Sequence, residues 1–481
     1  MAGRARRAAA VAATLVGVAA CFARLRVETW YVDEVAYVRA GAAYARGDFA
    51  PNGEHPPLAK LLFGLGERAF GGPYGARVVA ALCGALLVVT VAAFAERSYR
   101  GGAVAVVAWL AIPRSARLAG ATLIAGPLER HAMLDVVATA LATLGLAAGW
   151  RWARGGRWRD AVLAGACAGL AAAAKLPGGL YLPGVLLVAV ATRGEVRRRA
   201  AQAGAAGAAA VAAWAAAFLP MGGGAPAAMR EVFARQLGHA TDGHPMVYAG
   251  RVLPRAPWWG QAWIEWDHDG PLLVAVLAAA AVAAFAWGDR RLAALLALAF
   301  AGPFVALSAS PVALPHYRYV WLPPLALLAG LGVVSAARAR PAPRTVALAA
   351  CGVLAAGAVA NTGNALRLRT GDYRAASAYV GADRRVYLDG YLGTARAELA
   401  GARYVPLRRF LAGAAVDAVV LDRATTSRHD MRAVRAELRR RRWGCHVTVD
   451  RLDVWLAPGR CVSAASASAT PAGRRPSWPA T

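Results

Sequence analysis

Lysine is almost absent from this chain of 481 residues, in which it occurs only at Lys60 and Lys175. Arginine carries nearly all of the positive charge, which indicates a compositional bias toward arginine and alanine. A lysine that persists against such a bias is expected where a compact ammonium group is needed, because lysine and arginine are not interchangeable. Both lysines are therefore candidate functional residues.

Acidic residues are also few. The chain has 27 of them against 55 basic residues, so its formal net charge is +28. Such an excess occurs in nucleic-acid-binding proteins, but here the arginines lie in short clusters between long apolar segments. That distribution is typical of the cytoplasmic loops of membrane proteins. We therefore expect membrane lipids, and no nucleic acid, among the partners.

Metal-binding patterns are missing. The six cysteines form no CxxC motif and no cysteine–histidine spacing of a zinc site. The Asp-His-Asp run at 267–269 is a single weak cluster, so we predict no metal site and no cofactor. Cys445 and Cys461 flank a predicted hairpin and would pair if that region is external; two free thiols are the alternative. The other cysteines lie in apolar segments, where they pack as small hydrophobic residues: Cys21, Cys83, Cys167 and Cys351.

Hydrophobic residues, by contrast, make up 58% of the chain, and the mean hydropathy is +0.41. They are grouped in long blocks, which predicts an all-α polytopic membrane protein. We expect about eleven transmembrane helices. Their predicted limits are residues 8–25, 76–95, 102–124, 132–150, 161–176, 178–192, 200–219, 271–287, 291–310, 318–336 and 345–361.

The charge of the connecting segments predicts the orientation of these spans. Short arginine-rich segments follow alternate spans, from the loop at 151–160 to that at 337–344. By the positive-inside rule these loops and the N-terminus lie in the cytoplasm, in a multi-pass protein of the plasma membrane. A cleaved signal peptide at residues 1–25 is the alternative. The segments expected outside are 26–75, 126–131, 220–270, 311–317 and 362–481.

Composition divides the chain into three parts. Residues 1–361 form the predicted transmembrane domain, whose external loop 26–75 carries two amphipathic helices at the membrane surface. Residues 362–461 contain two strand patterns, a basic helix and a terminal hairpin, which predict a small α/β extracytoplasmic domain without a recognisable catalytic motif. Residues 462–481 have the composition of a disordered tail.

An adjacent acidic pair, Asp33 and Glu34, directly follows the first predicted span. Acidic side chains close to a bilayer need a partner or a task. In one interpretation Asp33 caps the following helix and Glu34 favours its positive end. In the other, one carboxylate is a general base that takes a proton from an incoming hydroxyl group. The sequence leaves both interpretations open, as it does the choice between the two carboxylates.

Basic side chains are predicted at the outer ends of several spans. Arg77 opens the second span, Lys175 ends the fifth, and Arg318 begins the tenth. Each alone is a common interfacial anchor, whereas together they suit a donor phosphate group. Asp135, inside the fourth span, needs an ion-pair partner, which either Arg130 or Lys175 would provide. The supporting residues of the candidate site are His55, Lys60, Arg130, His131, Asp135 and His316.

The order of these motifs resembles that of the dolichyl-phosphate-mannose–protein mannosyltransferases and the related aminoarabinose lipid A transferases. The likeness covers about residues 10–340 and leaves out the C-terminal domain. It rests on the Asp-Glu pair, HPPLAK at 55–60, GARVVAALCG at 75–84, ERHAMLDV at 129–136, AKLPGGLYLPG at 174–184 and HYRYVWLPPLALLAG at 316–330.

The resemblance implies a C-type glycosyltransferase fold, a polyprenyl- or dolichyl-phosphate-linked sugar donor, and an external active site. It places Asp33 at the acceptor hydroxyl with Glu34 in support. Arg77 matches the arginine that opens the family's second span, and Asp135 matches the acidic residue of its second outer loop. The chain departs from the eukaryotic protein mannosyltransferases in one respect, because the loop 220–270 is too short for their β-trefoil module. The acceptor is therefore left undecided.

Together these observations predict an inverting hexosyltransferase. It would pass mannose or another hexose from a polyprenyl phosphate carrier to a hydroxyl acceptor, chiefly protein Ser/Thr, on the external face. A lipid or glycan acceptor is one alternative. Another is a polytopic transporter that uses Asp135 and Lys175 as a coupling pair, although no internal repeat of the kind common in transporters is present. A non-catalytic assembly subunit is the third.

Overall fold

The computed structural model describes most of the chain, apart from short gaps and the C-terminal segment. The described residues are 2–25, 31–118, 121–124, 126–191, 196–242, 246–248, 251–339, 341–367, 376, 379–380, 384–388, 403–423, 428–449 and 452–460. The chain divides into two compact units. The first comprises Met1–Leu25, Tyr37–Arg114 and Pro127–Leu366, and the second comprises Arg26–Ala36, Ser115–Gly126 and Arg367–Thr481.

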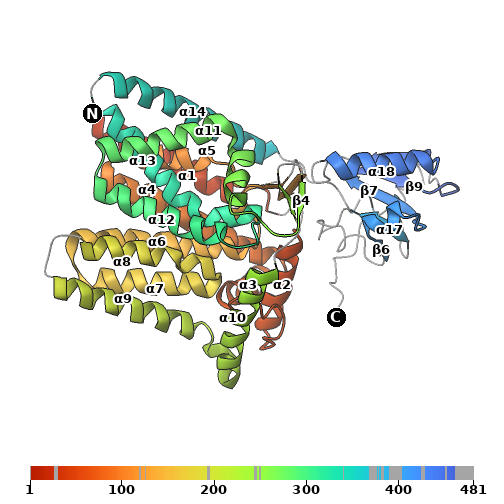
Figure 1. Ribbon diagram of the computed structural model, residues 1–481, viewed down its shortest axis with the longest axis horizontal. Helices are drawn as coiled ribbons and strands as arrows, with labels where there is room; N and C mark the ends of the chain where they lie inside the picture. The colour runs from red at the N-terminus through yellow and green to blue at the C-terminus, as the bar shows by residue number, and fades with distance from the viewer. Residues whose placement is uncertain are drawn as a thin grey trace. The chain divides into compact units, whose positions relative to one another are not determined.

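The first unit is helical (Figure 1), with α6 packed on α7 and α7 on α9, while α4 contacts α1, α3, α5 and α6. Helix α2 (Val32–Tyr44) begins in the second unit and continues into the first. The other α-helices are α1 (Ala2–Phe22), α3 (Leu58–Phe70), α4 (Tyr74–Tyr99), α5 (Gly102–Ala111), α6 (Leu134–Gly155), α7 (Trp158–Ala174), α8 (Leu182–Ala191), α9 (Val196–Ala216), α10 (Ala225–Asp242), α11 (Gly260–Trp287), α12 (Arg290–Ser308), α13 (Leu322–Ala337) and α14 (Pro341–Arg367). Short 3₁₀ helices and one small hairpin connect them: η1 (Leu128–Arg130), η2 (Leu176–Tyr181), η3 (Leu219–Gly224), η4 (Pro315–Trp321), β3 (Met246–Tyr248) and β4 (Arg251–Leu253).

The helices confirm a multi-pass membrane protein. Within the described residues, seven helices are long and apolar enough to cross a membrane, and the bent pair Val196–Ala216 and Leu219–Gly238 adds an eighth if it forms one span. Each of the eleven predicted spans contains a helix. However, α5 and α8 have 10 residues each, and a straight helical span needs about 20. The count of eleven therefore stays a prediction.

The predicted span 102–124 is wrong beyond its first half. Helix α5 ends at Ala111, and Ile112 has an extended backbone. The reason is Pro113, because a proline disfavours the helical conformation of the residue before it. Residues 116–124 instead contain an antiparallel hairpin of β1 (Ala116–Leu118) and β2 (Ala121–Ile124).

The predicted loop 220–270 is also largely helical where it is described. It contains η3, α10 and the first part of α11. Helix α11 begins at Gly260, and the expected start of the span at 271 is a break inside this helix, where Gly270 has φ 71° and is followed by Pro271. The glycine and proline pair marks a kink between two helical segments.

Glycines join α2, α3 and α4 at close range. A Cβ atom added to Gly64 of α3 would overlap the backbone carbonyl of Gly41 in α2, and one added to Gly75 of α4 would overlap that of Gly66 in α3. Only residues without a side chain allow such an approach. The two helices predicted for the loop 26–75 are present as α2 and α3. The close approach of Gly66 and Gly75 holds α3 against α4.

The second unit contains a five-stranded sheet in the order β6-β5-β7-β9-β8. Strand β5 (Arg385–Leu388) is parallel to β6 (Arg403–Val405) and β7 (Ala418–Asp422), while β9 (Leu452–Leu456) is antiparallel to β7 and to β8 (Cys445–Val449). The predicted strands, hairpin and basic helix are thus confirmed, whereas β6 and the short helix α17 (Leu407–Leu411) were not foreseen.

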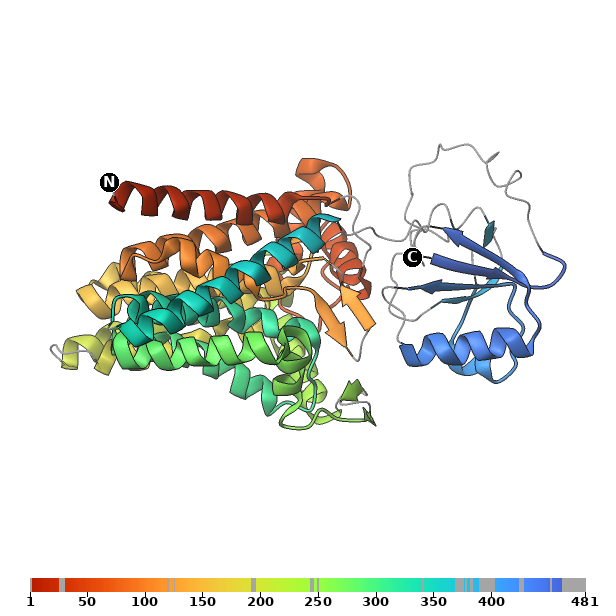
Figure 2. The same ribbon diagram turned by 90° about the horizontal axis from the view of Figure 1, so that it is seen from above.

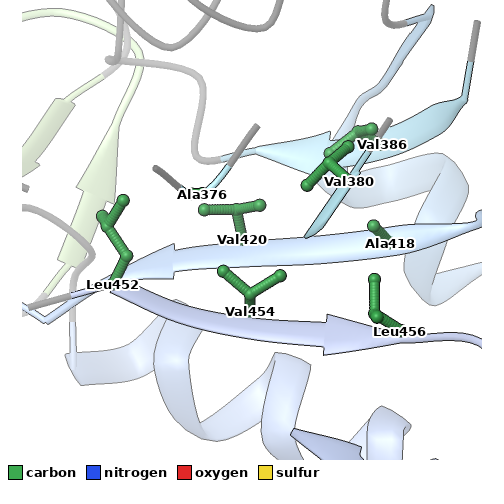
Figure 3. Close-up of a cluster of buried hydrophobic side chains, with 8 residues drawn as sticks. All are labelled: Ala376, Val380, Val386, Ala418, Val420, Leu452, Val454 and Leu456. Carbon is green, nitrogen blue, oxygen red and sulfur yellow. The ribbon is translucent and has the colours of Figure 1, made fainter. Parts of the chain in front are cut away.

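Both faces of this sheet are buried, because side chains alternate between them. Figure 3 shows the first cluster, in which Val386, Val420 and Val454 pack together. The opposite cluster includes Val419 and Leu421 and is covered by α17 and by α18 (Arg428–Arg440). Figure 2 shows α18 running along this face.

Two sequence-based predictions fall partly outside the described residues. Cys445 is disulfide-bonded, but Cys461 lies outside them, so the pairing of these two residues stays a prediction. The proposed tail at 462–481 lies outside them as well. The remaining cysteines are free thiols: Cys21, Cys83, Cys167 and Cys351.

Candidate functional site

Lys175 and Asp135 form a buried ion pair in the helical unit. The Lys175 Nζ atom lies 2.8 Å from Oδ1 and 2.9 Å from Oδ2 of Asp135. Asp135 is in the first turn of α6, and Lys175 directly follows the last residue of α7. Each charge therefore also complements the dipole of its helix. Of the two partners considered for Asp135, the structure selects Lys175 and not Arg130.

This ion pair lines a small pocket. Its other polar lining residues are Thr139, one turn after Asp135 on α6, and Tyr317 of η4. The Lys175 Nζ atom lies 4.5 Å from the centroid of the Tyr317 ring. The apolar part of the wall comes from Ala138, Pro177, Gly178, Leu307 and Val320. The buried ion pair is thus enclosed by a mostly apolar wall.

The 3₁₀ helix η4 sends consecutive side chains to different helices. Tyr317 contacts Lys175 at the end of α7, Arg318 contacts α11, and Tyr319 packs edge-on against Trp109 of α5 with ring centroids 5.6 Å apart. A 3₁₀ helix has about three residues per turn, so neighbouring side chains point roughly a third of a turn apart. His316, in the same segment, is buried as well.

Arg318 is held by two carboxylates. Its guanidinium lies 2.6 Å from Oε2 of Glu265 and 2.5 Å from Oδ1 of Asp269, and it donates a further hydrogen bond of 2.6 Å to the carbonyl of Pro113. Trp321 Nε1 donates to Glu265 at 2.7 Å. These contacts favour a structural role for Arg318 over the predicted contact with a donor phosphate.

Arg77 is fully buried in the first turn of α4. A positive charge there opposes the helix dipole. Its Nη1 donates a hydrogen bond of 2.8 Å to the carbonyl of Leu25, just past the end of α1. Arg77 thus connects the first turn of α4 to the residues just after α1. The sequence predicted this arginine at the outer end of its span.

Arg130 and His131 are also buried, but they lie in η1 and directly after it. Arg130 donates hydrogen bonds of 2.9 Å to the carbonyls of Ala20 in α1 and Ala365 in α14. It therefore joins the ends of three elements. Among the described residues the ion-pair partner of Asp135 is Lys175.

Sequence reasoning missed a second buried ion pair. Arg114 Nε lies 2.7 Å from Oε1 of Glu129, and both side chains are almost fully buried. Arg114 also donates a hydrogen bond of 2.7 Å to the carbonyl of Trp109. Arg114 was assigned to a transmembrane span, where a charged residue should have signalled that the span ends earlier.

The acidic pair Asp33 and Glu34 lies in the first turn of α2, in the second unit. Glu34 is fully buried, and its Oε2 accepts a hydrogen bond of 3.3 Å from the backbone N–H of Tyr31. This is the return half of a capping box, in which the third helical residue reaches back to the N-cap. Glu34 therefore caps the helix, while Asp33, in the same turn, is partly exposed.

His55 and Lys60 belong to the HPPLAK motif, which leads into α3. The His55 Nε2 atom lies 3.4 Å from the hydroxyl oxygen of Tyr37. The Lys60 Nζ atom donates to the carbonyls of Asn52 and His55 at 2.5 and 2.7 Å. Burial lowers the pKa of Lys60 to about 7, and the nearby Glu54 only partly opposes this shift.

The residues that the structure describes contain no group of three or more metal-binding side chains. Within the Asp-His-Asp run, the His268 Nδ1 atom lies 2.8 Å from the carbonyl oxygen of Ile264 and Asp269 pairs with Arg318. His268 is thus bonded within α11, and Asp269 belongs to the Arg318 ion-pair cluster.

Comparison with known proteins gives two findings. Residues 54–217 match the family model described as dolichyl-phosphate-mannose-protein mannosyltransferase. The fold is similar to the crystal structure of ArnT from Cupriavidus metallidurans bound to undecaprenyl phosphate, with a TM-score of 0.59 and 16% sequence identity over 94% of this chain and 99% of that chain. No curated protein sequence matches the chain. The two findings confirm the resemblance drawn from the sequence motifs, and the second establishes the ArnT-like fold.

Proposed function

We propose that this chain is a membrane glycosyltransferase that takes a sugar from a polyprenyl phosphate carrier. One observation carries the proposal: Asp135 and Lys175, which form a buried ion pair, both lie in the segment that matches the mannosyltransferase model. The undecaprenyl phosphate bound to the structural neighbour is consistent with a carrier of this class.

Transfer needs a base for the acceptor and charge compensation for the leaving group. The acceptor hydroxyl oxygen bonds to the anomeric carbon while the bond from that carbon to the phosphate oxygen breaks. The hydroxyl proton passes to a carboxylate, and the polyprenyl phosphate leaves with the bonding electrons. Attack opposite the leaving group inverts the anomeric configuration. No metal ion is required by this scheme.

We assign the base to Asp33. Glu34 is buried and occupied by the capping hydrogen bond to Tyr31, whereas Asp33 is partly exposed in the same helical turn. A base needs access to its substrate proton, so Asp33 is the better of the two. Glu34 then fixes the direction of the turn that carries Asp33.

Arg77 and Lys175 are proposed to stabilise the departing phosphate. Both are buried cations of the helical unit, and preorganised positive charge in a water-poor site strongly stabilises a developing anion. Arg318 is left out of this group because two carboxylates, those of Glu265 and Asp269, more than offset its charge, whereas Lys175 is paired with the single carboxylate of Asp135. His55 lies in the proposed entrance loop, residues 50–57, which Lys60 of α3 holds by hydrogen bonds to two backbone carbonyls.

The sugar and the acceptor follow less directly. Mannose or a related hexose on protein Ser/Thr is the preferred pair, and a lipid or glycan hydroxyl is the second. We place the reaction on the external face of the plasma membrane, because the arginine-rich loops select the cytoplasmic side.

The deciding experiment uses the purified full chain in liposomes with radiolabelled polyprenyl-phosphate mannose. If the chain transfers the sugar, the radiolabel should leave the lipid fraction only when a hydroxyl acceptor is present. Polyprenyl phosphate should accumulate at the same time. A transporter using the buried Asp135–Lys175 pair would move intact label across the bilayer without cleavage. Absence of cleavage with mannose, other hexose and aminopentose donors would refute the proposal.

A further inference from the structure

A single buried amino group bridges two carbonyls of the segment that precedes α3. Lys60 is completely buried, and its Nζ donates to Asn52 at 2.5 Å and to His55 at 2.7 Å. Its remaining direction faces the ring of Tyr44, whose centroid is 4.9 Å away. An amino group has no acceptor when charged and at least two N–H donors in either protonation state. Both carbonyls therefore remain bonded whether or not Lys60 carries a proton.

The bridged segment, residues 50–57, has no helix or strand to fix its backbone. Side chains supply the missing bonds. Gln236 of α10 donates to the carbonyl of Glu54 at 3.0 Å, and Asn52 Nδ2 donates to the Glu54 side chain at 3.0 Å. Asn52 itself has φ 56°, a left-handed conformation that asparagine tolerates better than most residues. With Lys60, these contacts determine the conformation of the segment.

The segment presents His55. The backbone carbonyl of His55 is held by Lys60, while the imidazole lies edge-on to Tyr37, with ring centroids 5.6 Å apart and an interplanar angle of 78°. Two contacts thus fix the position of His55: one at its backbone carbonyl and one at its ring. Substitution of Lys60 would remove the contact at the carbonyl and leave the contact between the His55 and Tyr37 rings.

We propose that Lys60 is a positioning residue that acts through His55: it fixes the backbone of the entrance loop so that the imidazole is presented to the sugar-phosphate donor. This inference rests on the proposed function. The geometry also explains why a lysine persists in an arginine-biased chain. Two carbonyls that face one point suit a compact amino group, whereas the planar guanidinium of arginine presents its donors in a wider fork.

The charged surroundings agree with an anchor, not with an acid or base. The ionisable groups that face Lys60 are Glu54 from the loop, Glu231 from α10 and the phenol of Tyr44 from α2. None of the ion pairs found among the described residues includes Lys60. Its hydrogen bonds go to backbone carbonyls, which fix a loop but do not accept a proton in catalysis.

The test is a double-mutant cycle on the full chain in liposomes. Lys60→Met keeps an unbranched side chain, one atom shorter, and removes the hydrogen bonds to both carbonyls. Turnover should fall about 10²-fold, the size produced by a misplacement of roughly 1 Å near a reacting centre. In the His55→Ala background the same substitution should have no further effect, because Lys60 acts only through His55. Arg46→Met removes an exposed charge between α2 and the loop and should leave turnover unchanged.

A second readout does not depend on activity. Diethyl pyrocarbonate modifies accessible imidazoles, and mass spectrometry of the peptide that contains His55 gives the rate of modification. Lys60→Met should raise this rate severalfold at unchanged rates for other histidines, whether or not the donor has been identified. Equal rates, or additive losses of turnover in the cycle, would overturn the inference. Should Lys60→Met fail to fold, Gln236→Leu provides a second variant, because it removes the hydrogen bond from half-buried Gln236 to the Glu54 carbonyl. This variant should also raise the rate of His55 modification. An unchanged rate would overturn the inference. If His55 responds as expected but no donor is cleaved, only the proposed function fails.

Discussion

The ammonium group of Lys175 bonds to both carboxylate oxygens of Asp135, at 2.8 and 2.9 Å, with each side chain less than a tenth exposed. Breaking a buried ion pair by removing one partner leaves an uncompensated charge, which costs about 3–5 kcal/mol. Lys175→Met alone should therefore destabilise the protein strongly, and Lys175→Met combined with Asp135→Leu should recover most of that loss. Thermal unfolding in detergent measures both effects. Recovery of full transfer activity in the double variant would contradict a role for Lys175 at the donor phosphate.

The acidic pair of α2 should divide its roles between stability and catalysis. Asp33→Asn should reduce turnover by at least about 10²-fold, the usual contribution of a general base, while the protein still folds. Glu34→Gln weakens the hydrogen bond to the Tyr31 N–H, so it should lower stability by about 1 kcal/mol with a smaller effect on turnover. Near-normal turnover of folded Asp33→Asn would show that another group is the base.

Two buried arginines of the helical unit should respond differently to removal. Arg77→Ala should reduce kcat/KM for the donor by about tenfold or more, since a hydrogen bond to a charged group contributes roughly 1.5–3 kcal/mol. Arg318→Ala leaves Glu265 and Asp269 facing each other without a cation. Its main consequence should be a lower unfolding temperature. Kinetics at several donor concentrations, combined with thermal unfolding, separate the two. A normal unfolding temperature for Arg318→Ala would rule out its structural role.

Lys60 should make stability depend on pH above neutrality. Its pKa is about 7 in the folded chain and 10.5 as the ordinary value. Between these two values the unfolded state binds more protons, so the free energy of unfolding rises with pH through this window. The contribution is complete above pH 10.5 and is lost as the pH falls to 7. Unfolding midpoints should be measured from pH 6.5 to 9.5 for the natural chain and for Lys60→Met. The natural chain should gain stability with rising pH relative to Lys60→Met, because other titrating groups affect both chains equally.

Topology can be checked by cysteine labelling in intact cells. A cysteine introduced at Arg409, exposed on α17, should react with a membrane-impermeant maleimide, whereas one at Gly155, at the end of α6, should react only after permeabilisation. The expectation rests on the positive-inside rule. The background lacks the four free cysteines. The reverse pattern would place the C-terminal unit in the cytoplasm and would remove the argument for an external reaction.

Local signals predicted the elements well. Pro56 and Pro57 precede α3, and prolines suit the beginning of a helix. A short continuous apolar run marked the buried strand β7, and the terminal hairpin pattern marked β9. The capping role of Glu34 also had a local signal, because the third helical position is where a glutamate reaches back to the N-cap. It was missed because Asp33 is the more familiar capping residue type.

The ion pairs were harder to foresee. Asp135 clearly needed a cation, but the choice between Arg130 and Lys175 depends on which helix ends meet in space. Glu265 and Asp269 lie about fifty residues before Arg318 in a segment predicted as loop. Arg318 therefore looked available for a phosphate. Its neutralisation depends on α11 being helical from Gly260 onward, which the Gly270–Pro271 pair concealed.

The 3₁₀ helix η4 imposes a limit on how this chain can evolve. Because Tyr317, Arg318 and Tyr319 point to three different helices, inserting or deleting one residue within η4 would rotate every later side chain by about a third of a turn. Arg318 would then leave its carboxylates, and an aromatic ring would take its place among them. Point substitutions can be tested one at a time by selection, but a change of length alters all three contacts at once. The length of this segment should therefore vary less among homologous chains than its individual residues do.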